Sequence, residues 1–480
     1  METVKSPTFK KYFLLFVPLV VIVLLFLKVS SSDAAAVLAA LLFCWTLLFY
    51  RENEYRAADI PVLFLILGTF SFGKAFSLLG MPVKGITIYM TEILLAASLG
   101  LLILTAKKVW RQWLLPLPKG LLPAILLYFT LGVIYMLIGF KLNGSAAFRD
   151  IVFAIYMLFL FITLSLLDQP VKTRNLLSFL KPAIILVLLT GVIVFFIYVP
   201  ESSFRGFVKE IKMTNFGLYF GIILFFCLSF FGKVLHEGNK KMKIALGFIM
   251  YFSMLFIVMA EVRAAWAGLL VSLIFLGILL KKEIKIVALI LILVAVSIVI
   301  IDYFDLGVQA NKLDSLTEQV RSLTRQNVPT MPVANIKWRL GIWKHTIAEI
   351  KEYPLFGWGY GTQIDYEIWG KKLSWLKAIS ASTGIVPPHN HLLSVTYKMG
   401  LVGLALFLFI NARIFFYGLV YIKKCKSDFN RRFLIAGLAA LLHWHGMALF
   451  FDILESPPTG IFLWIILGSI LAVVHADKNA

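Results

Sequence analysis

The sequence predicts an all-α polytopic membrane protein with about 12–14 transmembrane helices and a partly helical extracytoplasmic cap between two late spans. Hydrophobic residues make up 60% of the 480 residues, and the mean hydropathy is +0.90. Soluble domains are only about 45–50% apolar. Apolar runs of roughly 17–25 residues, long enough to cross a ~30 Å hydrocarbon core, recur along the whole chain. These observations exclude a soluble fold.

The apolar runs define about fourteen spans in chain order. They lie near residues 12–28, 34–50, 60–80, 87–106, 120–140, 149–167, 182–199, 214–232, 244–260, 264–280, 286–301, 391–421, 432–452 and 459–475. The first span has a basic flank but no small-residue cleavage site, and further spans follow it. We therefore expect it to be retained as a helix rather than removed as a signal peptide.

The positive charges are distributed among the loops between spans. Lys and Arg number 46 against 25 Asp and Glu, a net charge of +21. Because these cations are scattered rather than gathered on one soluble face, they indicate positive-inside topology and not nucleic-acid binding. If Lys5, Lys10 and Lys11 are cytoplasmic, every strongly basic loop falls on the same side, so we expect both termini in the cytoplasm.

Three segments on the expected outer side break this pattern or extend far beyond a short loop: 200–213, 261–263 and 302–390. The first contains Arg205 and the second contains Arg263, on the side where topology disfavours cations. Such cations are candidates for function. The expected organisation is four parts: helices in 1–199, helices carrying outer Arg residues in 200–301, a periplasmic cap in 302–390, and helices in 391–480.

The expected cap contains amphipathic helical patterns and a glycine-rich turn. The first apolar stripe consists of Leu313, Leu316, Val320 and Leu323. The second consists of Ile336, Leu340, Trp343, Ile347 and Ile350, which also recur at helical intervals. The second predicts a helix with one apolar face on the membrane or on its neighbours. Pro354 ends it, and the glycines at 357, 359 and 361 permit positive φ and close backbone approach.

Metal and nucleotide motifs are missing from the sequence. Cys44 and Cys227 lie inside spans and Cys425 lies in a basic loop, with no CxxC spacing. There is no Asp-x-Asp pair in an outer loop, no HExxH and no Walker A loop. We expect no metal, no cofactor and no use of ATP.

Several short motifs in fixed order resemble the O-antigen ligase and polymerase superfamily. They are Arg205-Gly206, Thr214-Asn215, Arg263, Arg339, Trp343, Pro354-Leu355-Phe356-Gly357-Trp358-Gly359, His389-Asn390-His391-Leu392 and Gly400-Leu401-Val402-Gly403. The resemblance covers roughly residues 200 to 410. It implies transfer of a glycan from undecaprenyl pyrophosphate to an acceptor hydroxyl at the periplasmic face of the bacterial inner membrane, in contact with the lipid bilayer.

Arg205 and Arg263 suit the departure of a pyrophosphate. Negative charge develops on this leaving group, and fixed cations stabilise it in the transition state. Arginine is always charged and contacts phosphate oxygens bidentately. The alternatives are that Arg263 only snorkels at the end of a span and that Arg205 is an ordinary loop charge.

His389 is the candidate base. A histidine with a pKa near ~6.5 can take the proton of a sugar hydroxyl at neutral pH. The alternative is an interfacial histidine that caps the following span. The resemblance implies substrate-binding roles for Arg339, Asn215, Asn390, Trp343 and His391.

Other ionisable residues have expected structural roles. Lys74 and Glu92 are expected to pair between adjacent spans, with a polar cavity for the carrier head group as the alternative, and Arg149 with Asp150 could border that cavity. His443 and His445 lie within a span and point to different faces, which favours packing or hydrogen bonding.

The sequence leaves alternatives open. A secondary transporter also has many spans with intramembrane charges, although no repeat is visible, and a lipid-linked glycan flippase shares the expected substrate. Within the enzyme class the acceptor could be lipid A core oligosaccharide (a ligase), a carrier-linked repeat unit (a polymerase) or a protein Ser or Thr (a protein O-oligosaccharyltransferase). We favour the ligase, because a cap of about ninety residues after the span of Arg263 resembles the ligase branch of this superfamily.

Overall fold

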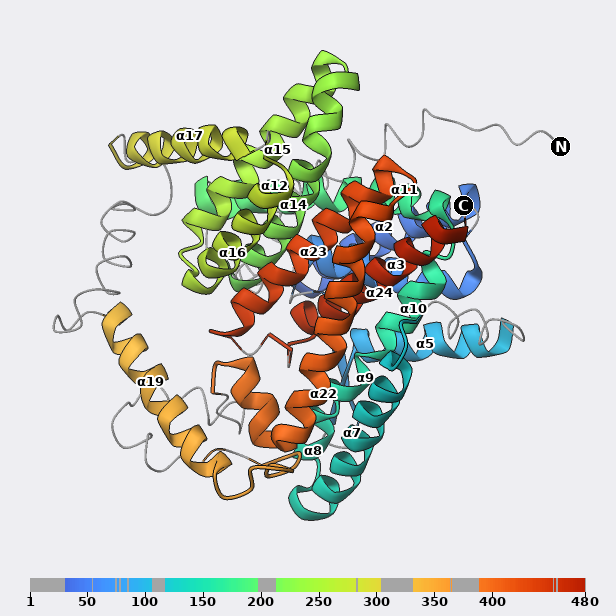
Figure 1. Ribbon diagram of the computed structural model, residues 1–480, viewed down its shortest axis with the longest axis vertical. Coiled ribbons are helices and arrows are strands. Elements are labelled where there is room, and N and C mark those ends of the chain that lie inside the picture. The colour runs from blue at the N-terminus through green and yellow to red at the C-terminus, as the bar shows by residue number, and fades with distance from the viewer. Residues whose placement is uncertain are drawn as a thin grey trace.

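A computed structural model of the chain describes residues 31–53, 55–73, 76, 79–83, 86–105, 117–196, 213–281, 284–303, 331–362, 364, 388–451, 453–454 and 456–479. Most of them are helical (Figure 1). The helices are α2 Ser31–Glu52, α3 Ile60–Phe72, α5 Met90–Thr105, α7 Leu121–Asn143, α8 Ala146–Asp150, α9 Val152–Ile155, α10 Leu158–Leu166, α11 Pro170–Phe179, α12 Lys181–Phe196, α14 Met213–Glu237, α15 Lys240–Met259, α16 Arg263–Leu279, α17 Ile284–Tyr303, α19 Met331–Ile350, α22 His391–Tyr421, α23 Asp428–Ala448 and α24 Pro457–Asn479, with short 3₁₀ turns at Ala57–Asp59 and Ile422–Lys424.

The described helices confirm an all-α polytopic membrane protein. Seven of the spans are long and apolar enough to cross a membrane, and five further apolar helices have 10–17 residues. Every predicted span from 34–50 onward overlaps a helix, whereas the predicted span 12–28 lies outside the described residues. The expected division of the chain into four parts stays a prediction.

One predicted span is too long. Helix α3 ends at Phe72, eight residues before the expected boundary, because Gly73 adopts φ 53 and its N–H closes the helix on Thr69 O. A short antiparallel hairpin follows, formed by β1 Gly80–Val83 and β2 Ile86–Tyr89. The segment between α3 and α5 is therefore a structured hairpin and not the end of a span.

Helix α24 forms the centre of the bundle. In its apolar window 94% of the residues are buried, and it packs against α10, α22 and α23 (Figure 1). Small residues allow close approach elsewhere in the core: the Cα of Gly268 lies where a Cβ on Gly446 would project, 2.5 Å away. Because lipid tails are as apolar as the helices, such close van der Waals packing is what holds the spans together.

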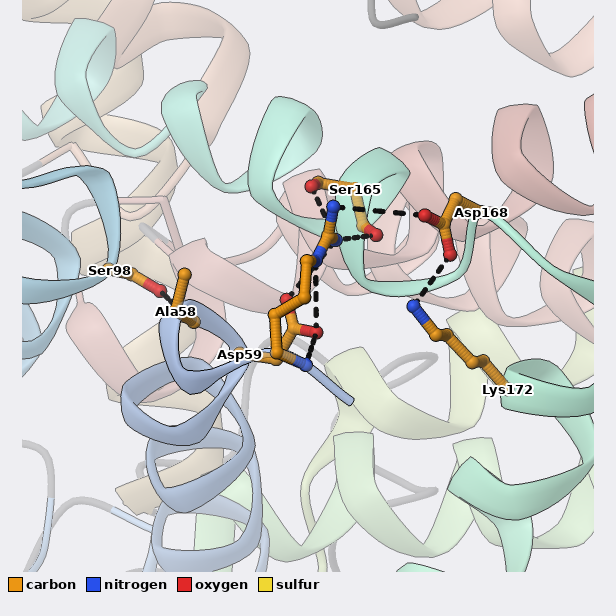
Figure 2. Close-up of polar contacts among 7 residues, drawn as sticks. Ala58, Asp59, Ser98, Ser165, Asp168 and Lys172 are labelled. Carbon is orange, nitrogen blue, oxygen red and sulfur yellow. Dashed lines mark hydrogen bonds and ion pairs between the residues drawn. The ribbon is translucent and has the colours of Figure 1, made fainter. Parts of the chain in front are cut away.

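The basic loops gather at one end of the bundle, which we call the basic end. Arg432 Nη1 donates to Ser229 O at 2.6 Å, and Lys172 Nζ pairs with Asp168 at 2.8 Å. Figure 2 shows Asp168 facing Lys172, with Asp59 and Ser165 nearby. Arg56 contacts the same Asp168 carboxylate at 3.7 Å. These contacts bring together basic residues of the described loops that were predicted to share one side of the membrane, while the identity of that side stays a prediction.

Candidate active site

Helix α22 is broken at Gly400, and the glycine-rich turn fills the break. Gly400 adopts φ 66 and ψ −172, so the helical hydrogen bonds across it are lost. Tyr397 O and Lys398 O instead accept from Trp358 N (2.7 Å) and Gly359 N (3.0 Å). Leu401 N and Val402 N donate to Pro354 O (2.8 Å) and Leu355 O (3.2 Å). All four backbone groups are paired, as a break in a membrane helix requires.

The glycines explain why two distant sequence motifs occur together. A Cβ on Gly400 would lie 2.1 Å from Leu355 O, and one on Gly357 would lie 2.6 Å from Tyr397 O. Both residues also have positive φ, at 66° and 70°. The turn is anchored on its other side by helix α7, where Tyr135 Oη donates to Phe356 O and Asn143 Nδ2 donates to Tyr360 O at 2.9 Å. The turn and the break therefore form one backbone unit.

Tyr360 closes this unit beneath the turn. Its side chain is fully buried, and burial raises the pKa of its hydroxyl well above the ordinary tyrosine value. The hydroxyl therefore stays protonated and donates to Met399 Sδ at 3.4 Å. Tyr360 therefore packs in the protein interior and keeps its hydroxyl as a hydrogen-bond donor.

His389 stands at the start of α22 in a strained conformation. Its φ is 50, unusual for a residue with a side chain. The next residue caps the helix, since Asn390 Oδ1 accepts from Leu393 N at 3.1 Å. The His389 ring is half-buried and lies against Phe451, with 5.7 Å between ring centroids.

Helix α19 brings Arg339 and Trp343 to the same place. Arg339 Nη1 donates to Phe450 O at 3.1 Å, and its guanidinium lies 5.8 Å from the centre of the Phe451 ring. Trp343 Nε1 donates to Pro388 O at 2.7 Å. Arg339 and His389 thus share Phe451, and Trp343 fixes the residue that precedes His389.

The second helix predicted in the cap is observed as α19, but its buried face differs from the predicted stripe, while the first apolar stripe, which begins at Leu313, lies outside the described residues. Leu340 and Ile347 are 49% and 45% exposed, whereas Ile342 and Thr346 are fully buried. The polar hydrogen bonds of Arg339 and Trp343 orient α19 toward the Phe450–Phe451 turn. An apolar stripe alone could not reveal this rotation, because the exposed stripe is compatible with contact to lipid.

Arg263 begins α16 at the same end of the bundle. Helices α16 and α23 run antiparallel: Ser272 Oγ donates to Ala439 O at 2.8 Å, and Gly268 packs against Gly446. Arg263 lies five residues before Gly268, and Phe451 lies five residues after Gly446, so Arg263 is level with the Phe450–Phe451 turn that follows α23. Its side chain is half-buried.

The structure describes the backbone of Asn215 and does not describe Arg205. Asn215 lies in the first turn of α14, two residues before Gly217, whose position packs against Ala265 of α16. Its backbone is therefore at the same end as Arg263. Arg205 lies outside the described residues, so its role stays a prediction.

Among the predicted site residues whose side chains the structure describes, His391 is the most deeply buried. It is 0% exposed and surrounded by rings, stacking on Phe153 at 6.2 Å and meeting Phe407 and Trp444 edge-on at 4.9 and 5.5 Å. Contact with a substrate would require this cage to open. The predicted substrate-binding role is untested by this geometry.

A buried ion pair was not expected from the sequence. Lys398 Nζ donates to Asp150 Oδ1, and Gly361 N donates to Asp150 Oδ2 at 2.7 Å. The sequence suggests for Asp150 only a position at the border of a cavity, and it indicates no role for Lys398. The partners are 248 residues apart in sequence, and no local pattern signals such a pair.

The other ionisable residues are held by hydrogen bonds. Glu92 accepts from Tyr156 Oη at 2.6 Å and Tyr89 N at 2.7 Å, while its expected partner Lys74 lies outside the described residues. His443 Nε2 lies 2.9 Å from Gly217 O, and His445 Nε2 lies 3.2 Å from Asn411 Oδ1. Those contacts confirm hydrogen-bonding roles for the two histidines. Among the described residues no group of three His, Cys, Asp or Glu could hold a metal ion; the metal-free and cofactor-free reaction stays a prediction.

Known proteins are similar in sequence to the region that contains this candidate site. Residues 248–408 match the family model described as O-antigen ligase. Proteins named "Putative polysaccharide ligase" are similar in sequence: one from Rickettsia typhi is 28% identical over 267 residues, covering 52% of this chain and 58% of the relative. Those from Rickettsia prowazekii and Rickettsia conorii are 27% and 25% identical over 265 and 283 residues, or 52% and 55% of this chain. The matches span 58% and 60% of the length of those two relatives. Residues 248–408 contain α16, α19, the glycine-rich turn, His389 and the break in α22, so the part of the chain that is similar to the O-antigen ligase family is the part that builds this site.

Proposed function

We propose that this protein is an O-antigen ligase-type glycosyltransferase. It moves a glycan from undecaprenyl pyrophosphate to a hydroxyl of lipid A core oligosaccharide, at the periplasmic face of the bacterial inner membrane, with both termini in the cytoplasm. The main support is the meeting of His389 and Arg339 on the ring of Phe451, at the end of the bundle where Arg263 begins α16. A neutral base and cations within one site suit this transfer.

His389 takes the proton of the acceptor hydroxyl in this proposal. The hydroxyl oxygen attacks the anomeric carbon while the bond from that carbon to the pyrophosphate oxygen breaks, and the proton passes to the His389 ring. The electron pair of the broken bond leaves with the carrier pyrophosphate. No metal or cofactor takes part.

Arg263 and Arg205 stabilise the departing pyrophosphate. Half-burial of Arg263 supports this role, because electrostatic stabilisation is stronger where water is partly excluded. Arg339 and Trp343 hold the sugar and orient the segment before His389, with Asn390 and Asn215 as further substrate-binding residues. His391 would reach substrate only after a rearrangement of its aromatic cage.

The acceptor is inferred from the ligase names of the family model and the relatives. The test is product formation by the purified full chain in lipid nanodiscs, using labelled undecaprenyl-pyrophosphate-linked glycan with lipid A core, with a second carrier-linked repeat unit, or with a Ser/Thr peptide. The ligase proposal expects label on lipid A core only. Lengthened carrier-linked chains would make it a polymerase, and labelled peptide would make it a protein O-oligosaccharyltransferase. Movement of intact donor across the membrane without transfer would indicate a transporter.

A further inference from the structure

An apolar groove runs between α12 and α15, away from the candidate active site. Its volume is about 630 Å³. Each helix contributes a stripe at four-residue spacing: Ile184, Leu188 and Val192 from α12, and Ile244, Phe248 and Phe252 from α15. Lys241 is the one charged side chain among its lining residues.

The groove begins at the basic end. Lys241 lies in the first turn of α15, and the loop before that helix follows Glu237 at the end of α14, where Arg432 contacts Ser229. Lys181 begins α12 shortly before Ile184, and later in the two helices Gly191 packs against Phe256, so α12 and α15 both start at this end and run in the same direction. From Lys241 to Phe252 the groove spans about 16 Å at 1.5 Å per residue. This is roughly half of a ~30 Å hydrocarbon core, the depth of one leaflet.

Positive charge concentrates where the groove opens. Lys240, Lys241 and Lys181 are exposed and Lys243 is half-buried, and none of these four forms an ion pair with an acidic side chain in the described part of the chain. The start of α15 adds the positive end of a helix dipole. A phosphate at this depth would be attracted both by the lysines and by the helix end.

From the groove and its cations we propose that α12 and α15 bind one anionic glycerophospholipid from the leaflet at the basic end. One acyl chain lies in the groove, and the phosphate lies against Lys240, Lys241 and Lys243. The depth of one leaflet matches an acyl chain and is short for a polyprenyl chain. The basic end is also opposite the candidate active site, so this lipid is not the glycan donor, and its binding does not depend on the transfer reaction.

Native mass spectrometry of the purified full chain tests this proposal by titration with phosphatidylglycerol and with phosphatidylcholine. We expect one tightly bound phosphatidylglycerol and at least tenfold weaker phosphatidylcholine binding. In the triple variant Lys240→Gln/Lys241→Gln/Lys243→Gln this preference is lost, because each lysine near the phosphate contributes roughly fivefold to it. The matched control Lys423→Gln/Lys424→Gln removes two exposed lysines of the Ile422–Lys424 turn at the same end and keeps the preference.

The groove itself is tested with Ala245→Trp. Ala245 lines the groove and is exposed, so a larger side chain fills the space without disturbing the core. We expect weaker phosphatidylglycerol binding with an unchanged melting temperature. Equal affinity for the two lipids, an unchanged preference in the triple variant, or tighter binding of undecaprenyl phosphate than of phosphatidylglycerol would each overturn the proposal.

Discussion

The ammonium group of Lys398 donates to the carboxylate of Asp150 in the interior of the protein, where the two side chains are 5% and 2% exposed. The same carboxylate accepts from Gly361 N. The pair thus joins α8, the first half of the broken helix α22 and the glycine-rich turn. It fixes the segment that begins at His389.

We expect removal of one partner to be strongly destabilising. Lys398→Met leaves the Asp150 charge buried and unpaired, which costs about 3–5 kcal/mol of unfolding free energy. Asp150→Asn in the same chain removes that charge while keeping an acceptor for Gly361 N, so the double variant should be more stable than Lys398→Met alone. Thermal unfolding in detergent measures both.

The control is Lys233→Gln, which breaks an exposed pair with Glu237 and should change stability by less than about 1 kcal/mol. Equal effects of Lys398→Met and Lys233→Gln would contradict a buried ion pair.

Gly400→Ala tests the helix break. The added Cβ meets Leu355 O and must also adopt a positive φ, so we expect a loss of at least about 2 kcal/mol. The melting temperature should fall and transfer activity should fall with it. Gly247→Ala is the control, because a Cβ there has no atom within 4 Å and alanine favours a helix interior. A tolerated Gly400→Ala would mean that the turn does not enter the break.

His389→Ala should lower the transfer rate by roughly 10²–10⁴ while donor binding persists, because a base acts on the acceptor and not on the pyrophosphate. The rate of the unaltered protein should fall as the pH drops below about 6.5, since a protonated imidazole cannot accept a proton. Single-turnover transfer across pH 5–8 measures both effects.

The control is His475→Ala, which changes a histidine at the basic end and should leave the transfer rate unchanged. In a ligase-null host, His389→Ala should accumulate carrier-linked polymer of normal length; restored lipopolysaccharide capping would remove His389 from the mechanism.

Arg263→Ala should reduce transfer at least tenfold, equivalent to about 1.4 kcal/mol of transition-state stabilisation. Arg263→Lys should recover only part of the rate, because bidentate contact with phosphate oxygens is lost. Arg205→Ala is expected to behave in the same way. Arg174→Ala changes an exposed arginine at the basic end and should be neutral. Near-normal rates in both Arg263 variants, at normal protein levels, would exclude the proposed contact with pyrophosphate.

The orientation can be tested by thiol labelling of intact spheroplasts. A cysteine at Thr362 or Ser203 should react with an impermeant maleimide added outside, and one at Asn239 should not. Cys425 should give little background even in opened membranes at neutral pH, because burial, together with the nearby Asp477 carboxylate, raises the pKa of its thiol to about 12 and the reactive thiolate forms only at much higher pH. A cysteine at Lys423 provides the accessible comparison on that side. Labelling of Asn239 but not of Thr362 would reverse the expected topology.

The helices could be predicted from sequence because the length of each apolar run indicates the length of its helix. Which residues of different helices contact one another could not be predicted in the same way. Phe450 and Phe451 have no distinguishing local pattern, yet their turn receives Arg339 and His389. The orientation of α19 depends on those same long-range contacts. Arg205 and Arg263 could be singled out because they are cations on the expected outer side, whereas His389 and Arg339 could be singled out because they stand in motifs that resemble the O-antigen ligase family.

Helix α24 has a consequence for how the protein is made. During synthesis its residues emerge after α10, α22 and α23, the helices against which it packs. Those helices enter the bilayer while their central partner is missing, and lipid can cover their apolar faces in the meantime because it is as apolar as α24. Inserting the spans and assembling them are therefore separate events in biogenesis, and a substitution within α24 should leave insertion of the earlier helices intact while preventing their final association.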